Sequence, residues 1–382
     1  MDFLKRLTRA RDEMTKRNIG LMYLTRGANL WYLTGVQRRE PELTDSNAYG
    51  DYICGAYIGA NDEFTLVGPR MGGASWLKEA EDKPYIKDVR IITETERPKT
   101  VLTEVVRGFP LKGTGIAVDD RAWMKSGRLF QQVMAKPLFS LASDIIAPMR
   151  MIKDQDEIAL MKKVGAITDD VFREVVPYLK VGLTEYDVAY EVDYHFTKRG
   201  AQFNSFVTGV RFTSPQRPRP MTAPRSSPRR LEEGDAITFD FGACYQGYCS
   251  DFGRTVFVGT PPGEFINIHD TVMEAQAAAI DSMVDGTITA TGLDQVAREI
   301  IEEAGYGPYF VHRLGHGIGV TVHEPPFLYI PDETILRSRM TFTVEPSIRL
   351  PNSWGARVED VVMVTDNGGV PFSKYSKELT VI

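Results

Sequence analysis

The feature that most constrains this chain is the run at residues 236–259, AITFDFGACYQGYCSDFGRTVFVG. Two strand-like stretches flank Gln246 and Gly247, which suit a tight turn, so the run is predicted to fold as a hairpin. If the loop holds an even number of residues, Asp240 and Asp251 point to the same face, because side chains alternate along a strand. Two carboxylates that face each other repel unless a proton or a metal ion compensates them. The alternative interpretation is a pair of solvated aspartates on an edge hairpin.

The histidines favour a metal or catalytic site. Three of the five lie within twelve residues, in FVHRLGHGIGVTVHEPP, as His312, His316 and His323. Imidazole is the commonest metal ligand and a frequent proton-transfer group. The glycines between them let the backbone approach a site closely. Packing alone explains such a cluster poorly.

Two glutamates in strand-like contexts extend the candidate site. Glu345 lies in VEP and Glu359 in RVED, and a charged glutamate inside MTFTVEPSI would be costly to bury without a partner. A bound metal removes that cost. The candidate ligands are Asp240, Asp251, His316, Glu345 and Glu359. An oxygen-rich set with one imidazole is typical of paired Mn, Fe, Co or Zn ions and not of a thiolate-rich structural zinc.

Together these segments resemble the M24, or pita-bread, metallopeptidases, in particular the creatinase-like branch that includes prolidase and aminopeptidase P. The resemblance covers nearly the whole chain. It is carried by NLWYLTG at 29–35, GD-x5-DFGA and GYCSDFGRT within 234–255, GHGIG followed by VHEPP, and VEP and RVEDVVMVT. It implies an α+β protein, with a smaller creatinase-like α/β N-terminal domain at residues 1–149 and a pita-bread catalytic domain at residues 150–382.

The resemblance also implies an arrangement of the ligands. Asp240 should bind one of two divalent metal ions, and Asp251 and Glu359 should bridge both. His316 and Glu345 should complete the shell of the other ion. Manganese is the expected metal, with Co, Fe or Zn as alternatives. A homodimer is implied in the same way.

On the substrate side, the resemblance assigns four roles. His323 is expected to contact the substrate carbonyl or assist proton transfer, and His312 to be a second substrate-side histidine. Arg357 is expected to orient the site or a substrate carboxylate, and Glu345 to act as general base toward a bridging water. These roles imply hydrolysis of Xaa-Pro dipeptides, or removal of the N-terminal residue from short Xaa-Pro peptides.

One position departs from the family pattern. The peptidases usually have a pocket histidine seventeen residues before the first aspartate ligand, and here that position is Ala223. The alternative is therefore a non-peptidase enzyme on the same scaffold, an amide hydrolase or a lyase acting on a small molecule. A non-catalytic binding module is disfavoured, because all five ligand types are present.

The segment 211–230 around Ala223 has six arginines, five prolines and no periodicity. It is either an ordered loop near the site or a mobile surface loop. Its arginines could recognise a carboxylate or another anion, or could simply be solvated.

The N-terminal residues are predicted to form a mixed sheet with covering helices. A charged helix is expected at 3–16. The strand-like runs are 19–23, 52–59, 64–68 and 115–119.

After a boundary near 148–153, a helix with Asp154, Asp156 and Glu157 in its first turn has apolar positions at helical spacing. Capping boxes at Thr184 and Thr291 predict two more helices, and a fourth is expected from about residue 262 to 286. Strands are predicted at 236–242, 254–259, 340–348 and 356–365.

The composition limits the partners and the cellular location that we expect for this chain. The net charge of −6 argues against a broad nucleic-acid footprint, and the three cysteines form no CxxC pair. No signal peptide and no apolar run of membrane-spanning length are visible. A cytoplasmic protein that binds neither nucleic acid nor membranes is expected.

Overall fold

The computed structural model describes residues 1–38, 50–111, 115–220 and 222–382. The chain divides into two compact units, Met1–Met149 and Arg150–Ile382. Among the described residues, no helix is long and apolar enough to cross a membrane.

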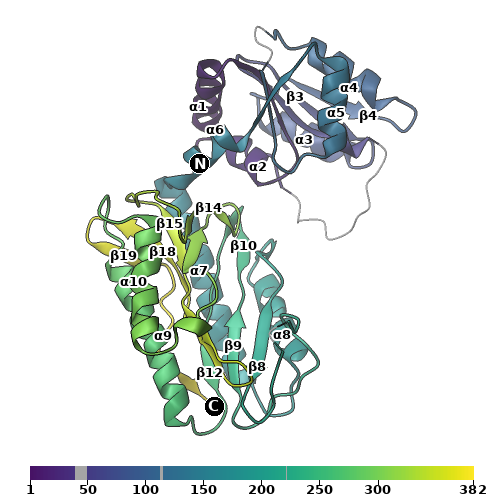
Figure 1. Ribbon diagram of the computed structural model, residues 1–382. Coiled ribbons are helices and arrows are strands. Elements are labelled where there is room, and N and C mark those ends of the chain that lie inside the picture. Colours follow the sequence, from purple (N-terminus) through teal and green to yellow (C-terminus); the bar gives the residue numbers. More distant parts are fainter. Residues whose placement is uncertain (39–49, 112–114, 221) are drawn as a thin grey trace. The chain divides into compact units, whose positions relative to one another are not determined.

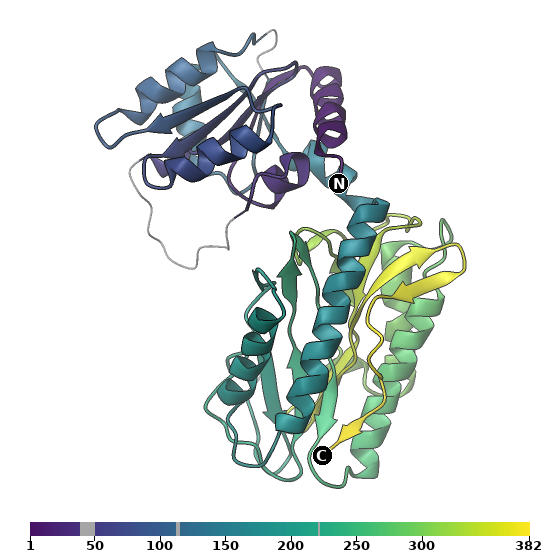
Figure 2. The same cartoon turned by 180° about the vertical axis from the view of Figure 1, so that it is seen from behind.

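The first unit is a six-stranded mixed sheet with strand order β4-β3-β2-β1-β5-β6. Strand β2 pairs antiparallel with both β1 and β3, and the outer pairs are parallel. Helices α4 and α5 cover one face and α3 the other (Figures 1 and 2). The strands are β1 (Ile19–Leu24), β2 (Gly55–Gly59), β3 (Phe64–Pro69), β4 (Asp88–Ile92), β5 (Gly115–Val118) and β6 (Leu138–Leu141). The helices are α1 (Phe3–Lys16), α2 (Ala28–Thr34), α3 (Gly73–Asp82), α4 (Pro98–Arg107), α5 (Met124–Val133) and α6 (Ser143–Met151).

The expected mixed sheet is confirmed, but one strand boundary was wrong. The run at 52–59 was predicted as a single strand, whereas Asp51–Ile53 forms a 3₁₀ turn and β2 starts at Gly55. Gly55 has a φ of 147° and lies so close to β1 that a Cβ there would be 2.2 Å from the Leu24 carbonyl oxygen. Gly55 therefore begins the strand at a position where a residue with a Cβ would not fit.

The second unit packs α-helices against several mostly antiparallel strand groups. Figure 2 shows α7 lying across these strands. The helices are α7 (Gln155–Val175), α8 (Glu185–Lys198), α9 (Gly263–Asp281) and α10 (Ala290–Glu303). One four-stranded sheet contains β20 (Thr380–Val381), β12 (Thr255–Phe257), β9 (Ala236–Asp240) and β8 (Gly209–Thr213). One five-stranded sheet contains β14 (Glu324–Leu328), β13 (Gly315–Gly317), β15 (Thr341–Val344), β18 (Asp360–Thr365) and β19 (Gly368–Pro371). Smaller groups are β11 (Tyr248–Cys249), β10 (Ala243–Tyr245) and β7 (Phe203–Asn204), and the pair β16 (Ser347–Arg349) and β17 (Gly355–Arg357).

The second unit has two apolar cores. Helices α7 and α8 pack Val164, Val171, Val188 and Val192 into one cluster with side chains of β8 and β9. Helices α9 and α10 contribute Ile268 and Leu293 to a second cluster that includes residues of β15 and β18. The amphipathic spacing of these helices follows from burying one face against strands.

Helix starts were predicted well where the cap is local. Asp154 caps α7 with a capping box to Glu157, and Thr184 caps α8 in the same way. The cap of α10 was predicted incorrectly: Thr289 caps it, and the Thr291 hydroxyl donates instead to the carbonyls of Tyr329 and Asp332. Carbonyl groups from a distant segment accept the hydrogen bonds of Thr291, the residue that the local pattern had predicted as the helix cap. The helix expected at 262–286 ends at Asp281.

Candidate metal centre

The predicted hairpin forms, and its strand register determines how Asp240 and Asp251 lie relative to each other. Gln246 and Gly247 have φ of 44° and 85°, so both occupy the left-handed region of a two-residue turn. Cys244 pairs with Cys249, and the same register continues to the isolated bridge between Phe241 and Phe252. Asp240 and Asp251 are therefore diagonal neighbours on one face of the ribbon.

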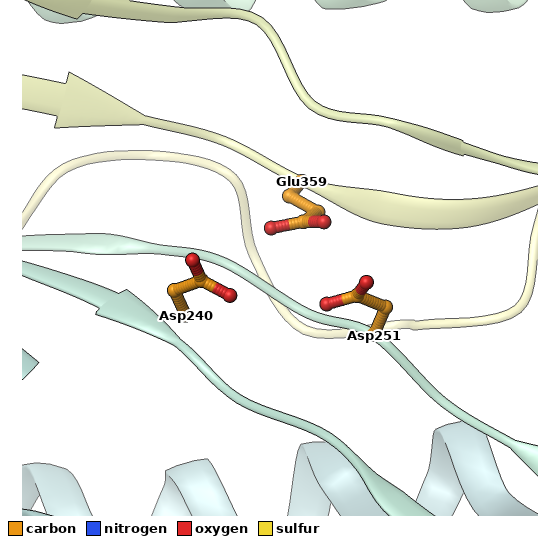
Figure 3. Close-up of side chains that lie close together, drawn as sticks. All are labelled: Asp240, Asp251 and Glu359. Carbon is orange, nitrogen blue, oxygen red and sulfur yellow. The ribbon is translucent and has the colours of Figure 1, made fainter. Parts of the chain in front are cut away.

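Asp240, Asp251 and Glu359 bring their carboxylates together: one oxygen from each lies within 4.8 Å of the others (Figure 3). The glutamate comes from the opposite sheet, between β17 and β18. Its backbone N–H donates to the Gly253 carbonyl at 2.9 Å, so the two sheets meet at the site. Arg254 reinforces this junction by donating to the Glu359 carbonyl and to Asp360, each at 2.7 Å.

Gly253 makes room for the third carboxylate. A Cβ at this position would lie 2.7 Å from both Glu359 Oε2 and Arg357 Cδ. The Gly253→Ala variant should displace Glu359 and weaken Mn²⁺ binding by about 10- to 100-fold, as does loss of groups that orient metal ligands. Calorimetric titration would measure this effect. Gly127→Ala is the matched control, because its Cβ would meet nothing within 4 Å; equal Mn²⁺ affinity in both variants would contradict the prediction.

His316 and Glu345 extend the carboxylate cluster at the Asp251 end. His316 Nε2 lies 3.4 Å from Glu345 Oε1 and 3.6 Å from Asp251 Oδ2. Its Nδ1 lies 3.1 Å from the Gly317 carbonyl oxygen, so a proton on Nδ1 leaves Nε2 free as a ligand atom. The Thr343 hydroxyl contacts both residues, as acceptor from the His316 N–H and as donor to Glu345.

Both strand-like runs that contain these glutamates are broken at the site. Residues 340–348 and 356–365 were each predicted as one strand, but β15 ends at Val344 and β18 begins at Asp360. Regular pairing therefore stops beside Glu345 and Glu359. Their side chains turn into the site and do not follow the alternation of a continuous strand.

The electrostatics of the cluster are those of crowded acids. Burial and the neighbouring carboxylates raise the pKa of Asp251 and of Glu359 well above their usual values, and burial raises the pKa of Glu345. Burial alone would raise the pKa of Asp240, but Arg357 and Arg225 outweigh it and lower that pKa.

Arg357 is the internal counter-charge of the cluster. Its guanidinium lies 3.0 Å from Asp240, 3.2 Å from Glu359 and 3.4 Å from Glu345. Burial alone would lower its pKa, but these carboxylates raise it. Arg357 and the more exposed Arg225 do not balance the four acids, so the cluster is short of positive charge.

The donor set fits divalent cations. Asp251 Oδ1 is buried without a hydrogen-bond partner among the described residues, which is unusual for a carboxylate oxygen that carries no ligand. Carboxylate oxygens with one imidazole nitrogen are hard donors of the kind that Mn²⁺ and similar ions prefer.

The two other predicted histidines line the same cavity of about 1050 Å³. The His323 ring is 4.2 Å from the His316 ring, centroid to centroid. Partial burial and His316 lower the pKa of His323 to about 4, so it is neutral near pH 7. His312 is held by the Arg313 carbonyl on Nδ1 at 2.7 Å and by the Ser347 hydroxyl on Nε2 at 2.5 Å.

The 211–230 segment contributes to the cavity wall. Arg225 lines the cavity, and its guanidinium lies 3.3 Å from Asp240. Other arginines of the segment are tied to buried acids, Arg219 to Glu185 and Arg217 to Asp235. In the described part of the segment, which omits residue 221, Arg217, Arg219 and Arg225 are thus held by ion pairs and are not simply solvated. Ala223 itself does not line the cavity.

Sequence reasoning missed three arginines of the cavity wall, Arg298 on α10 and two that lie inside recognised motifs. Arg349 and Arg313 both line the cavity, and Arg313 stacks over the Phe327 ring at 4.9 Å. The only sequence signal was their position inside motifs that carry ligands, EPSIR and HRLGH.

The chain matches two family descriptions. Residues 159–366 match metallopeptidase family M24, and residues 6–152 match the creatinase/prolidase N-terminal domain.

Individual relatives and solved structures agree with these matches. The chain is 31% identical to the Xaa-Pro dipeptidase of Pyrococcus furiosus over 379 residues, covering 98% of this chain and 99% of the relative. It is similar to the structure of recombinant prolidase from Thermococcus sibiricus, with a TM-score of 0.88, 30% identity and 100% coverage of both chains. A dipeptidase structure from Pyrococcus horikoshii has a TM-score of 0.85 at 29% identity, covering 99% of this chain and 100% of that one.

Proposed function

Because the chain belongs to metallopeptidase family M24, we propose that it hydrolyses the bond before proline, in Xaa-Pro dipeptides or at the N-terminus of Xaa-Pro peptides. The observation that carries the proposal is the site itself. Asp240, Asp251 and Glu359 converge beside His316 and Glu345 in a cavity large enough for a short peptide. Similar chains bear the names Xaa-Pro dipeptidase and prolidase.

The proposed cofactor is a pair of divalent cations, manganese first among them. Asp240, Asp251, His316, Glu345 and Glu359 are the proposed ligands. When bound, the ions would supply Lewis-acid chemistry, lowering the pKa of water and polarising the scissile carbonyl. The positive charge would also offset the mutual repulsion of the buried acids.

The chain's own groups then account for proton movement. Glu345 has an oxygen pointing into the cluster, 3.4 Å from His316 Nε2, so it can accept the proton of the attacking water. His323 is neutral and can donate one N–H to the substrate carbonyl oxygen as negative charge develops there. The proton held by Glu345 passes to the proline nitrogen, which leaves as a secondary amine.

Arg357 and His312 are proposed to position these groups. Arg357 contacts three of the carboxylates and limits how they can rotate. His312 is fixed by two partners at the cavity wall, where it can orient the substrate side of the site. A homodimer remains a prediction from the family resemblance, and a cytoplasmic location remains a prediction from the composition of the chain.

The test is hydrolysis of Ala-Pro, Leu-Pro, Gly-Pro and Ala-Pro-Ala by metal-stripped protein reloaded with Mn²⁺. We expect metal-dependent cleavage by the wild type and none by Glu345→Ala, because that variant lacks both a ligand and the proton acceptor. The ratio of dipeptide to tripeptide rates separates a dipeptidase from an aminopeptidase. If no peptide is cleaved although metal binds, the peptidase proposal is wrong, and small-molecule amides and lyase substrates should be tried.

A further inference from the structure

Two arginines project from strands into the cavity near Asp240. On β8 and β9, the residues that line the cavity alternate, with Gly209 paired to Asp240 and Arg211 paired to Thr238. The intervening residues Val210 and Phe239 point into the apolar core. Arg349 reaches the same cavity from β16, where it pairs with Gly355.

Neither guanidinium has an acid of its own. Within the described ranges, no carboxylate forms an ion pair with Arg211 or Arg349. Other arginines of this unit do have one: Arg254 pairs with Asp360 at 2.7 Å, and Arg298 with Asp294 at 2.9 Å. The contrast matters because a partly buried cation without a partner is costly.

Burial and neighbouring positive charges lower the pKa values of both arginines. Burial, Arg357 and Arg211 together lower the pKa of Arg349 to about 10, although Asp240 and Glu345 act in the opposite direction. Burial and Arg225 likewise lower the pKa of Arg211. Both side chains still carry charge near pH 7, so positive charge accumulates on this wall of the cavity.

The acids that line the cavity are already engaged. Asp240, Asp251, Glu345 and Glu359 belong to the proposed metal centre, and Asp294 is paired with Arg298. If divalent ions occupy the centre, the carboxylates are balanced and the arginines remain as net positive charge. A ligand that complements this wall of the cavity must therefore carry negative charge.

We propose that Arg211 and Arg349 form a carboxylate-binding subsite for the substrate. The inference rests on the proposed function and specifies it. Guanidinium groups bind carboxylates through parallel N–H donors, and two of them lining one cavity can hold one carboxylate. Two sources supply that chemistry in an Xaa-Pro substrate: the α-carboxylate of the proline, or an acidic side chain on the residue before it.

The experiment compares matched substrates that differ by one charge. The kcat/KM of Mn²⁺-loaded protein is measured with Ala-Pro against Ala-prolinamide, and with Glu-Pro against Gln-Pro. The proteins are the wild type, Arg211→Met, Arg349→Met and the control Arg173→Met, whose side chain is exposed on α7. Thermal unfolding of each variant checks that the fold is retained.

Each of Arg211→Met and Arg349→Met should lower kcat/KM about 10- to 100-fold for the substrate whose carboxylate it binds, and less than about 3-fold for the neutral analogue. A selective loss on Ala-Pro assigns the subsite to the α-carboxylate. A selective loss on Glu-Pro relative to Gln-Pro, with Ala-Pro spared, assigns it to the acidic side chain. Equal losses on charged and neutral substrates, or no loss on any, would overturn the subsite.

Binding separates this inference from the proposed function. Calorimetry with the same four compounds is run on Mn²⁺-loaded protein, because the inference requires the charges of the metal-centre carboxylates to be balanced. If the wild type cleaves none of them, the proposed function fails, yet the two variants should still lose affinity only for the charged members. Charge-independent binding in the wild type would overturn the subsite by itself.

Discussion

Replacing Asp251 with asparagine should abolish peptide hydrolysis while leaving the metal-free protein at least as stable as the wild type. Asp251 lies between Asp240, Glu359 and His316, and one of its oxygens is buried without a partner in the described structure. Loss of a shared ligand should lower kcat/KM for Ala-Pro by about 10³-fold or more, since metal ions contribute several kcal/mol to such reactions. Removing one of several crowded charges should relieve repulsion in the metal-free state.

The pH dependence of stability follows from the same charges. The folded-state pKa values of Asp251, Glu345 and Glu359 are raised, so their contribution is complete below their unfolded-state pKa values and is lost as the pH rises through the folded ones. In the metal-free state, the stability advantage of Asp251→Asn over the wild type should therefore grow as the pH rises above about 4, because the variant lacks one of these raised carboxyl groups.

Thermal unfolding with and without Mn²⁺ measures both effects. The wild type should gain stability on adding the metal, and Asp251→Asn should gain little. Asp170→Asn is the control, because Asp170 is an exposed acid on α7 paired with Arg173. If Mn²⁺ stabilises Asp251→Asn as much as the wild type, Asp251 is not a ligand.

The second large effect is expected away from the metal centre, at Glu324. This buried carboxylate directly follows His323 and accepts from Lys153 at 2.8 Å and from Arg150. Glu324→Gln keeps the shape but removes the negative charge that both cations share. Breaking a buried ion pair from one side typically costs about 3–5 kcal/mol, and we expect the free energy of unfolding to fall by that amount.

The sign of the pH effect is opposite at this position. Burial alone would raise the pKa of Glu324, but Arg150 and Lys153 outweigh it and lower that pKa. Its contribution is therefore present above the unfolded-state pKa of about 4.3 and is lost as the pH falls through the folded value. Urea unfolding of Glu324→Gln, alone and combined with Lys153→Met, measures the coupling. The double variant should recover part of the loss, and a change below about 1 kcal/mol in Glu324→Gln would show that the pair contributes little.

What the sequence predicted best was local. The hairpin turn at Gln246 and Gly247 and the caps at Asp154 and Thr184 depend on residues a few positions apart, so their patterns are complete in the sequence. The five candidate ligands were found because each lies in a short recognisable motif, and the structure brings them together. Their roles as ligands remain to be tested.

What failed depends on partners distant in the chain. The Thr291 hydroxyl bonds to carbonyls about forty residues away, and no local pattern records that. The run containing Glu345 is apolar enough to look like one strand, although the site interrupts it. An arginine in a sequence also looks the same whether an acid elsewhere pairs with it, as for Arg219, or not, as for Arg349.

The two separate apolar cores of the second unit have a consequence for how such an enzyme can change. Asp240 and Asp251 extend from the half built around α7 and α8, whereas His316, Glu345 and Glu359 extend from the half built around α9 and α10. The charged groups meet at the boundary, or seam, between these two halves. Neither apolar core contains the polar residues that line this seam. Arginines such as Arg211 and Arg349 can therefore be gained or exchanged at the seam while both cores stay intact. This architecture lets substrate preference diverge among relatives while the fold and the reacting groups are retained.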